Sequence, residues 1–425
     1  MKSFLLAATL SLALGLVAPG AAAQVVTIPD PGLQDAVRAA LGKPTGDITV
    51  SDMEGLSELD ASRATRGAAA PLIGSLEGIQ AARNLTRLIL SGSFSSPNLS
   101  STADLTPLDG LGQLRTLYLP FNQLVDLTLP TGLTGLATVY LYNNQITHLS
   151  LPAGLTNLAS LYVYNNQLGT LSLPAGLSRL ATLNLDNNPL TSLTLADSPS
   201  QLATLSLGST RLTDFAFLAG LTNLDTLHLY SGGLTSLTLP PGLANLRDLD
   251  LRSNQLTDFS FLTGRSNLVT LDLSRNQLQN LSLPAGLTGL TTLDVAYNQL
   301  THITLRADLA GLAAVYVDNN PLAELVVPEP AAGAVSPAVD LLRSQGVAVY
   351  LYPTDTRLTV GSPSLPGSFS LVLAGPPGTY RVQVTGDFSA WADLDAVTNS
   401  IGLATFSDTA SALRSAGIYR VRREP

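Results

Sequence analysis

The chain has 425 residues, of which 45% are hydrophobic and only 12% are charged. Its formal net charge is −9, and it contains no cysteine. A negative balance without a basic stripe argues against nucleic acid as a partner, and the lack of thiols excludes disulfides, thiolate catalysis and cysteine-ligated zinc.

Residues 1–23 have the features of a signal peptide. Lys2 precedes an apolar run from Phe4 to Val17, and three alanines that end at Ala23 supply a small-residue cleavage site. The run is shorter than the roughly 18 residues that a membrane span needs, and no later stretch reaches that length. We therefore expect a protein that is secreted or held at the cell surface, with the periplasm as an alternative, and no transmembrane segment after the signal peptide.

Residues 24–84 are expected to form an N-terminal helical cap and an irregular first coil. Asp30 can cap a helix that begins with Pro31. Leu33, Val37 and Leu41 follow on one helical face. Such a helix can cover the open end of a stacked array, whose terminal unit has no neighbour on one side.

Residues 85–333 are dominated by a repeat of 22 residues. Ten leucines from Leu114 to Leu312 begin successive copies at this spacing (136 − 114 = 22, and so on to 312 − 290 = 22), with the pattern LxxLxLxxNxL. This period and motif indicate leucine-rich repeats. We predict an α/β-type solenoid, a right-handed superhelix with a parallel β-sheet on its concave face.

An asparagine recurs eight residues after most starting leucines, from Asn122 to Asn320. We expect its amide to satisfy backbone groups where the chain turns out of the sheet. Thr210 and Gly232 interrupt this column, so the repeat there is either looser or bridged by the threonine hydroxyl and water. Two copies carry the variant DFxFL, whose phenylalanines, Phe215 and Phe259 first among them, are expected to fill the core.

The segment from Val26 to Leu322, with its cap-like "IPDPGLQDAVRAALGKPTGDITVSDMEGLSELDAS", resembles internalin-type bacterial surface proteins, which have a helical cap followed by 22-residue repeats. The resemblance implies a secreted or surface binding protein. It implies no particular ligand, and we do not expect the wall anchor that many members carry.

The repeat pattern ends after Leu325. We expect a C-terminal cap over residues 334–353, with a short helix around residues 337–344 and a strand over residues 347–352. Residues 354–425 contain five β-type runs between turn residues and are predicted to form a small all-β sandwich. Part of it resembles a C-terminal module of exported proteins from verrucomicrobial-type bacteria, and Trp391 is expected in its core rather than at a ligand.

The sequence offers no catalytic constellation. His148 and His302 occupy the same repeat position, where a turn is expected, and are seven copies apart (302 − 148 = 154 = 7 × 22), so they cannot share a metal. Signatures for a nucleophile elbow, zinc or phosphate are absent. We predict no enzyme, no cofactor and no metal site.

The solvent-facing positions of the sheet are expected two, four, six and seven residues after each starting leucine. They predict an exposed aromatic patch near the N-terminal half, the aromatic platform, which comprises Tyr118, Phe121, Tyr140, Tyr142, Tyr162 and Tyr164. Tyrosines on a rigid support are typical of binding sites. The alternative is that they only stabilise neighbouring strands.

His228 and Tyr230 follow on the same face, and beyond them lies an acidic cluster of Asp248, Asp250, Asp272 and Asp294, with Arg252 and Arg275 beside it. The cluster is either a surface salt network or a site for Ca²⁺ or a basic partner. The leading hypothesis is a non-enzymatic binding protein whose concave face engages a protein or peptide ligand. The alternatives are a glycan-binding adhesin and a structural component of a surface layer.

Overall fold

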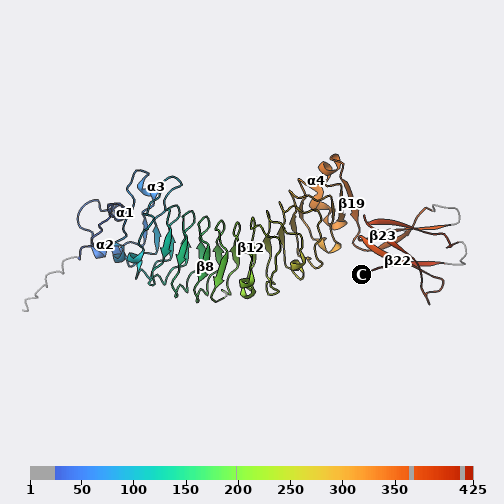
Figure 1. The fold of residues 1–425 in the computed structure, drawn as a ribbon, viewed down its shortest axis with the longest axis horizontal. Coiled ribbons are helices and arrows are strands. Elements are labelled where there is room, and N and C mark those ends of the chain that lie inside the picture. The colour runs from blue at the N-terminus through green and yellow to red at the C-terminus, as the bar shows by residue number, and fades with distance from the viewer. Residues whose placement is uncertain (1–23, 198, 363–367, 412–416, 425) are drawn as a thin grey trace, which may run out of the picture.

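The computed structural model describes residues 24–197, 199–362, 368–411 and 417–424. It shows an elongated, curved stack of coils, with helices α1 (Pro31–Leu41), α2 (Val50–Glu54) and α3 (Arg63–Arg66) at one end and antiparallel strands at the other (Figure 1). The predicted signal peptide, residues 1–23, lies outside the described residues.

Twelve short strands form one parallel sheet, which we call the large sheet. In spatial order they are β1 (Glu58–Asp60), β2 (Arg87–Ile89), β3 (Thr116–Tyr118), β5 (Thr138–Tyr140), β7 (Ser160–Tyr162), β9 (Thr182–Asn184), β11 (Thr204–Ser206), β12 (Thr226–His228), β13 (Asp248–Asp250), β14 (Thr270–Asp272), β15 (Thr292–Asp294) and β17 (Ala314–Tyr316). Residues one repeat apart are direct partners, as in the pairs Tyr118–Tyr140 and Tyr140–Tyr162. The stack of coils with its parallel sheet confirms the predicted solenoid.

The leucine spacing explains why every coil closes in the same way. In β5 the central Val139 is fully buried, while its two neighbours in the strand are half-buried. Because strand side chains alternate between faces, the central residue points into the coil and its neighbours point outward. The inward residues of successive coils stack into one hydrophobic cluster that runs from Ile28 to Val347.

One position of this core is charged. Arg265 lies where the coils before and after carry Leu243 and Leu287 (265 − 243 = 287 − 265 = 22), and it is only 6% exposed. Its guanidinium donates hydrogen bonds to the carbonyls of Leu239 and Pro240, at 3.2 and 2.6 Å, but its Nε has no partner among the described residues. Burial lowers the pKa of Arg265, because the charged form is removed from water without an acidic partner in the described chain.

The asparagine column forms a hydrogen-bonded ladder. Asn144 Nδ2 donates to Leu119 O in the preceding coil and to Leu141 O in its own, at 3.1 and 2.9 Å. Its Oδ1 accepts from the backbone N–H groups of Asn122 and Leu124, at 3.0 and 3.1 Å. One buried amide thus satisfies two backbone donors and two acceptors, as predicted. The ladder also begins one step earlier than predicted, since the Nδ2 of residue 98 donates to the carbonyls of residues 61 and 90.

The ladder has a gap at Thr210 and Gly232. Thr210 Oγ1 donates to Leu207 O at 2.8 Å, which is a bond within its own coil. The backbone N–H groups of Asn188 and Leu190, which the ladder pattern would pair with residue 210, find no such acceptor in the described part of the chain. The Thr210 hydroxyl therefore makes no direct bond to the preceding coil in the described part of the chain, and bridging through water stays a prediction.

The opposite side of the coils, the second face, mixes short strands and 3₁₀ turns. Its elements are the paired strands β4 (Asp126–Thr128) and β6 (His148–Ser150), the pair β8 (Thr170–Leu173) and β10 (Ser192–Leu195), strand β16 (His302–Thr304), and the turns η1 (Ile79–Ala81), η2 (Thr106–Leu108), η3 (Ala216–Gly220), η4 (Ser260–Leu262), η5 (Ala307–Leu309) and η6 (Glu329–Ala331). In the DFxFL copies the aspartate starts the turn, since Asp214 Oδ1 accepts from Ala216 N at 2.9 Å. Phe215 and Phe259 are buried, which confirms their predicted role in the core.

The N-terminal helix forms as predicted. The Asp30 side chain accepts from Leu33 N at 2.9 Å, Pro31 opens α1, and Gly42 ends it in the left-handed conformation with φ 60°. Leu33 and Val37 are fully buried. The helix packs beside β1 and covers the first coil.

At the other end, α4 (Ala332–Ser344) is longer than the predicted helix over residues 337–344. Strand β18 (Glu324–Pro328) pairs in parallel with β16 and with β19 (Ala348–Tyr352), so the final strand extends a sheet of the second face. Tyr352 at the end of β19 is fully buried, and its hydroxyl donates to Leu305 O at 2.5 Å.

The C-terminal module consists of two antiparallel sheets of three strands each, within the described residues. Their orders are β20 (Arg357–Val360), β21 (Phe369–Ala374), β24 (Leu403–Asp408), and β23 (Ala392–Asn399), β22 (Gly378–Thr385), β25 (Ile418–Arg423). The rings of Phe369 and Tyr419 stack between the sheets at 5.0 Å, which agrees with the predicted all-β module. The sequence did not reveal β23, because this edge strand is mostly polar and exposed.

The prediction for Trp391 was wrong. The ring is half-buried at the surface of the module, with the Arg420 guanidinium 4.0 Å from its centroid and the Phe388 ring 6.2 Å away. Tyr380, Val382 and others from the two central strands fill the core instead.

Candidate binding face of the large sheet

The aromatic platform forms where the sequence placed it. The rings of Tyr140 and Tyr162 stack at 5.0 Å with an interplanar angle of 4°, and those of Tyr142 and Tyr164 stack at 4.6 Å with the same angle. Tyr118 joins both rows, because its ring lies 4.9 Å from Tyr140 and its hydroxyl hydrogen bonds with that of Tyr142. The parallel register of the sheet produces this order, since equivalent side chains lie about 4.8 Å apart on neighbouring strands.

The platform is less exposed than expected. All its members are half-buried, because each ring covers the faces of its neighbours. Burial, followed by the hydrogen bond with Tyr118, raises the pKa of Tyr142, and burial also raises the pKa of Tyr164. The hydroxyls of Tyr142 and Tyr164 therefore stay protonated and can offer neutral hydrogen-bonding groups to a ligand.

Phe121 closes the platform from a special backbone position. Its φ is 61°, and the seventh residue after the starting leucine is left-handed in every later coil as well, for example Asn143 at φ 56° and Tyr297 at φ 56°. Asparagine tolerates this region, whereas phenylalanine adopts it at a cost. The ring of Phe121 lies edge-on to Tyr142 at 5.8 Å, which places an apolar group at the end of the platform.

The residues that lie six positions after each starting leucine are not uniformly exposed, which differs from the prediction. This column contains five buried residues, Pro120, Asp186, Gly208, Ser274 and Ala296. The chain turns back toward the core at this point, so small and backbone-bonded residues are enclosed there.

The middle coils carry a polar cluster that the sequence only partly revealed. The Tyr230 ring lies over Gly208, where an added Cβ would be 2.2 Å from the ring. Asp186 Oδ1 accepts from Gly208 N at 2.6 Å, and Ser206 Oγ lies 3.1 Å from His228 Nδ1. Burial raises the pKa of Asp186, and burial together with the Asp186 carboxylate raises that of Tyr230 to about 12.

Beyond this cluster, aspartates from adjacent strands face one another. Asp250 pairs in register with Asp272, and Asp272 with Asp294. Burial raises the pKa of Asp250 and of Asp294, and repulsion by neighbouring carboxylates raises both pKa values further. Burial likewise raises the pKa of Asp248, whose Oδ1 lies 3.9 Å from His228 Nε2.

The two arginines near the aspartates behave differently. Arg252 Nε lies 3.4 Å from Asp250 Oδ2, and its guanidinium is 4.8 Å from the Tyr230 centroid. Arg275 instead stacks on Tyr297 at 4.1 Å. Of these two arginines, only Arg252 forms an ion pair with the acidic cluster, and the salt network is less complete than the sequence suggested.

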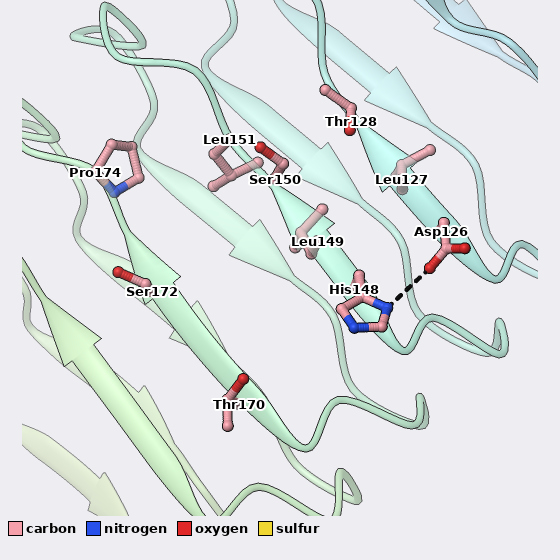
Figure 2. A pocket seen from close by; sticks show the side chains of 10 residues that line it. All are labelled: Asp126, Leu127, Thr128, His148, Leu149, Ser150, Leu151, Thr170, Ser172 and Pro174. Atoms are coloured by element: carbon pink, nitrogen blue, oxygen red, sulfur yellow. Dashed lines mark hydrogen bonds and ion pairs between the residues drawn. The ribbon is translucent and has the colours of Figure 1, made fainter.

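A groove of about 730 Å³ lies on the second face, remote from the platform (Figure 2). His148 Nδ1 lies 2.9 Å from Asp126 Oδ1. The rest of the lining consists of hydroxyl groups, such as those of Thr170 and Ser172, and of apolar side chains. His148 and His302 begin strands β6 and β16, so the expectation that they lie in turns was wrong.

Neither a metal-binding group nor a membrane-spanning helix is found among the described residues. No group of three histidine or carboxylate side chains there is arranged to hold a metal ion, so the calcium alternative for the acidic cluster gains no geometric support. No helix there is long and apolar enough to cross a bilayer.

Comparison with known proteins identifies the fold as one of leucine-rich repeats. Residues 266–313 match the family model of leucine-rich repeats in two copies. An internalin (inlF) from Listeria monocytogenes is 24% identical with a TM-score of 0.56, over 76% of this chain and 89% of its own. The leucine-rich repeat domain of APL1B is 19% identical with a TM-score of 0.54, over 78% of this chain and 94% of its own.

No curated protein matches the chain. The solved structures confirm the internalin-like leucine-rich repeat fold that the sequence predicted. The resemblance of the C-terminal module to exported proteins stays a prediction.

Proposed function

We propose that this chain is an exported, non-enzymatic binding protein that uses the face of the large sheet to recognise a protein or peptide. The leucine-rich repeat fold supports protein binding in general terms. The observation that carries the specific proposal is the aromatic platform, since ordered tyrosines on a rigid sheet provide contact area at little cost in conformational entropy.

The stacking geometry favours protein over glycan. A sugar ring stacks on a free aromatic face, but in each stacked tyrosine pair the two facing sides are already covered by the neighbouring ring. Ring edges and hydroxyls remain, and these suit backbone carbonyls and apolar side chains of a polypeptide.

The acidic cluster indicates the charge of the partner. Asp250 lies four strands beyond Tyr162 (β7 to β13 through β9, β11 and β12), which is about 19 Å at about 4.8 Å per strand. An extended segment of about six residues covers this distance. We expect a partner with apolar groups at one end and lysine or arginine at the other.

The test is a comparison of captured proteins. Three baits are exposed to the medium in which the protein naturally occurs. They are the full chain, a platform variant with Tyr140→Ser and Tyr162→Ser, and a control with Tyr297→Ser and Tyr316→Ser. The control tyrosines lie on the same sheet side and are 50% and 49% exposed. We expect the platform variant to lose a partner that the control retains. Equal capture by all three would refute the role of the platform, and selective binding on a glycan array would favour the adhesin.

A further inference from the structure

A cavity lies where the last coils meet the C-terminal module. It measures about 400 Å³ and is lined by the coil residues Thr304–Asp308, by Tyr352, by Pro376 and Pro377 of the turn before β22, and by Arg423 of β25. Sites for small ligands are frequent at such junctions. The cavity is remote in sequence from the aromatic platform, and its chemistry is different.

The walls of the cavity are firmly built. Tyr352 is anchored to the solenoid by its bond to Leu305 O, and Gly402 of the module packs so closely on it that an added Cβ would lie 2.3 Å from the Tyr352 Cβ. Tyr380 OH donates to Pro376 O at 2.6 Å, which holds the turn beside the cavity. These contacts hold the solenoid side and the module side of the cavity in place without a ligand.

Two guanidinium groups line this cavity, one from the solenoid and one from the module. Arg423 donates through Nη2 to Pro377 O at 2.6 Å, and its Nε would be 2.9 Å from a Cβ at Gly378, so the absence of that side chain allows its position. Arg306 donates through Nε to Asp308 Oδ1 at 3.1 Å. Each arginine has five N–H donors, and most are not used by these bonds.

The one carboxylate in the lining is already engaged. Asp308 Oδ2 accepts from Gly286 N at 2.8 Å, while Oδ1 accepts from Arg306. Burial raises the pKa of Tyr352, but both Arg423 and Arg306 act to lower it, so both positive charges reach the same hydroxyl. Two cations against one anion leave a net positive charge in the cavity.

We propose that this cavity binds a small oxyanion, a phosphate, sulfate or carboxylate group, which Arg306 and Arg423 hold together. Planar guanidinium groups bind such oxygens through paired hydrogen bonds. Because one arginine belongs to the solenoid and the other to the module, the bound anion links the two parts. The proposal is independent of what the large sheet binds.

The test uses the full chain and inorganic phosphate, titrated by calorimetry at constant ionic strength against chloride. We expect saturable binding at millimolar phosphate, weakened at least tenfold by Arg306→Gln and by Arg423→Gln. Arg420→Gln is the matched control, because Arg420 belongs to the same strand as Arg423 but stacks on Trp391. Circular dichroism checks that each variant is folded.

A variant with the opposite sign separates binding from damage. Asp308→Asn removes the competing negative charge and frees Arg306, so phosphate should bind more tightly, which a merely disturbed junction would not produce. Repeating the titration with sulfate and acetate identifies the preferred oxyanion. The proposal is overturned if the native chain shows no saturable binding of any of the three anions, or if both arginine variants bind as well as the control.

Discussion

Exchanging one asparagine of the ladder with the threonine at its gap tests what holds the coils together. We consider two variants, Thr210→Asn and Asn144→Thr. Asn144 makes bonds to two carbonyls and accepts from two backbone N–H groups, whereas Thr210 makes a single bond to Leu207 O. The two substitutions thus add or remove about three hydrogen bonds at equivalent positions.

The magnitude follows from the value of each bond. A buried hydrogen bond contributes about 1 kcal/mol net, and a buried group left without a partner costs about 1–3 kcal/mol. Asn144→Thr leaves two buried N–H groups without their acceptor, so we expect a loss of about 3–4 kcal/mol. Thr210→Asn should raise the free energy of unfolding by about 1–2 kcal/mol. This is less than three added bonds would give, because the coils at the gap have adapted to the shorter side chain.

Equilibrium unfolding in urea measures both variants, with the shift of the midpoint read at an unchanged slope. The double variant should lie near the sum of the single ones, since the two sites are three coils apart (210 − 144 = 66 = 3 × 22). If Thr210→Asn leaves the midpoint unchanged while Asn144→Thr lowers it, the ladder bonds do not explain the difference between the two sites.

Three further substitutions test particular contacts. Gly208→Ala should displace the Tyr230 ring and cost about 1–3 kcal/mol in urea unfolding, whereas Gly169→Ala, which has open space around its Cβ, should cost much less; equal effects would contradict the packing argument. Arg265→Leu should raise the unfolding free energy by about 1–2 kcal/mol, because it removes a buried charge from a leucine column, and a lower stability would show that its carbonyl bonds outweigh that cost. The pKa of Asp250 is raised in the folded state, so its burial as a carboxylate destabilises the fold at neutral pH. Its contribution to stability increases as the pH falls through the folded-state pKa toward the ordinary value of 3.8, and it is constant below 3.8. Asp250→Asn should therefore raise the melting temperature at neutral pH more than at pH 4, and a pH-independent change would contradict the shift.

Spacing alone predicted the solenoid, because the burial of a leucine depends only on its position in the repeat. It also predicted which tyrosines meet, since the parallel sheet pairs residues 22 apart. The degree of exposure was not predictable in this way. The stacking of Tyr142 on Tyr164 depends on how whole rings orient across coils, and no residue pattern encodes that orientation directly.

Other features were visible in the sequence but need the structure for their meaning. Gly208 and Tyr230 occupy the same repeat position in consecutive coils, a small residue beneath a large one, and this pairing could have predicted their contact. Arg265 stands in a column of leucines and could have been noticed by the same comparison. The surface position of Trp391 could not, because its partner Arg420 is supplied by a strand 29 residues later (420 − 391 = 29).

The gap in the ladder also bears on how unfolding spreads along the molecule. In a stack whose units contact only their neighbours, stability is a sum of coil energies and interface energies, and a boundary between folded and unfolded coils forms where an interface is weakest. The interfaces around Thr210 lack the amide bonds found on either side, so such a boundary should settle between β9 and β12. The aromatic platform and the acidic cluster then belong to separate cooperative blocks, and a ligand that contacts both would join those blocks into one.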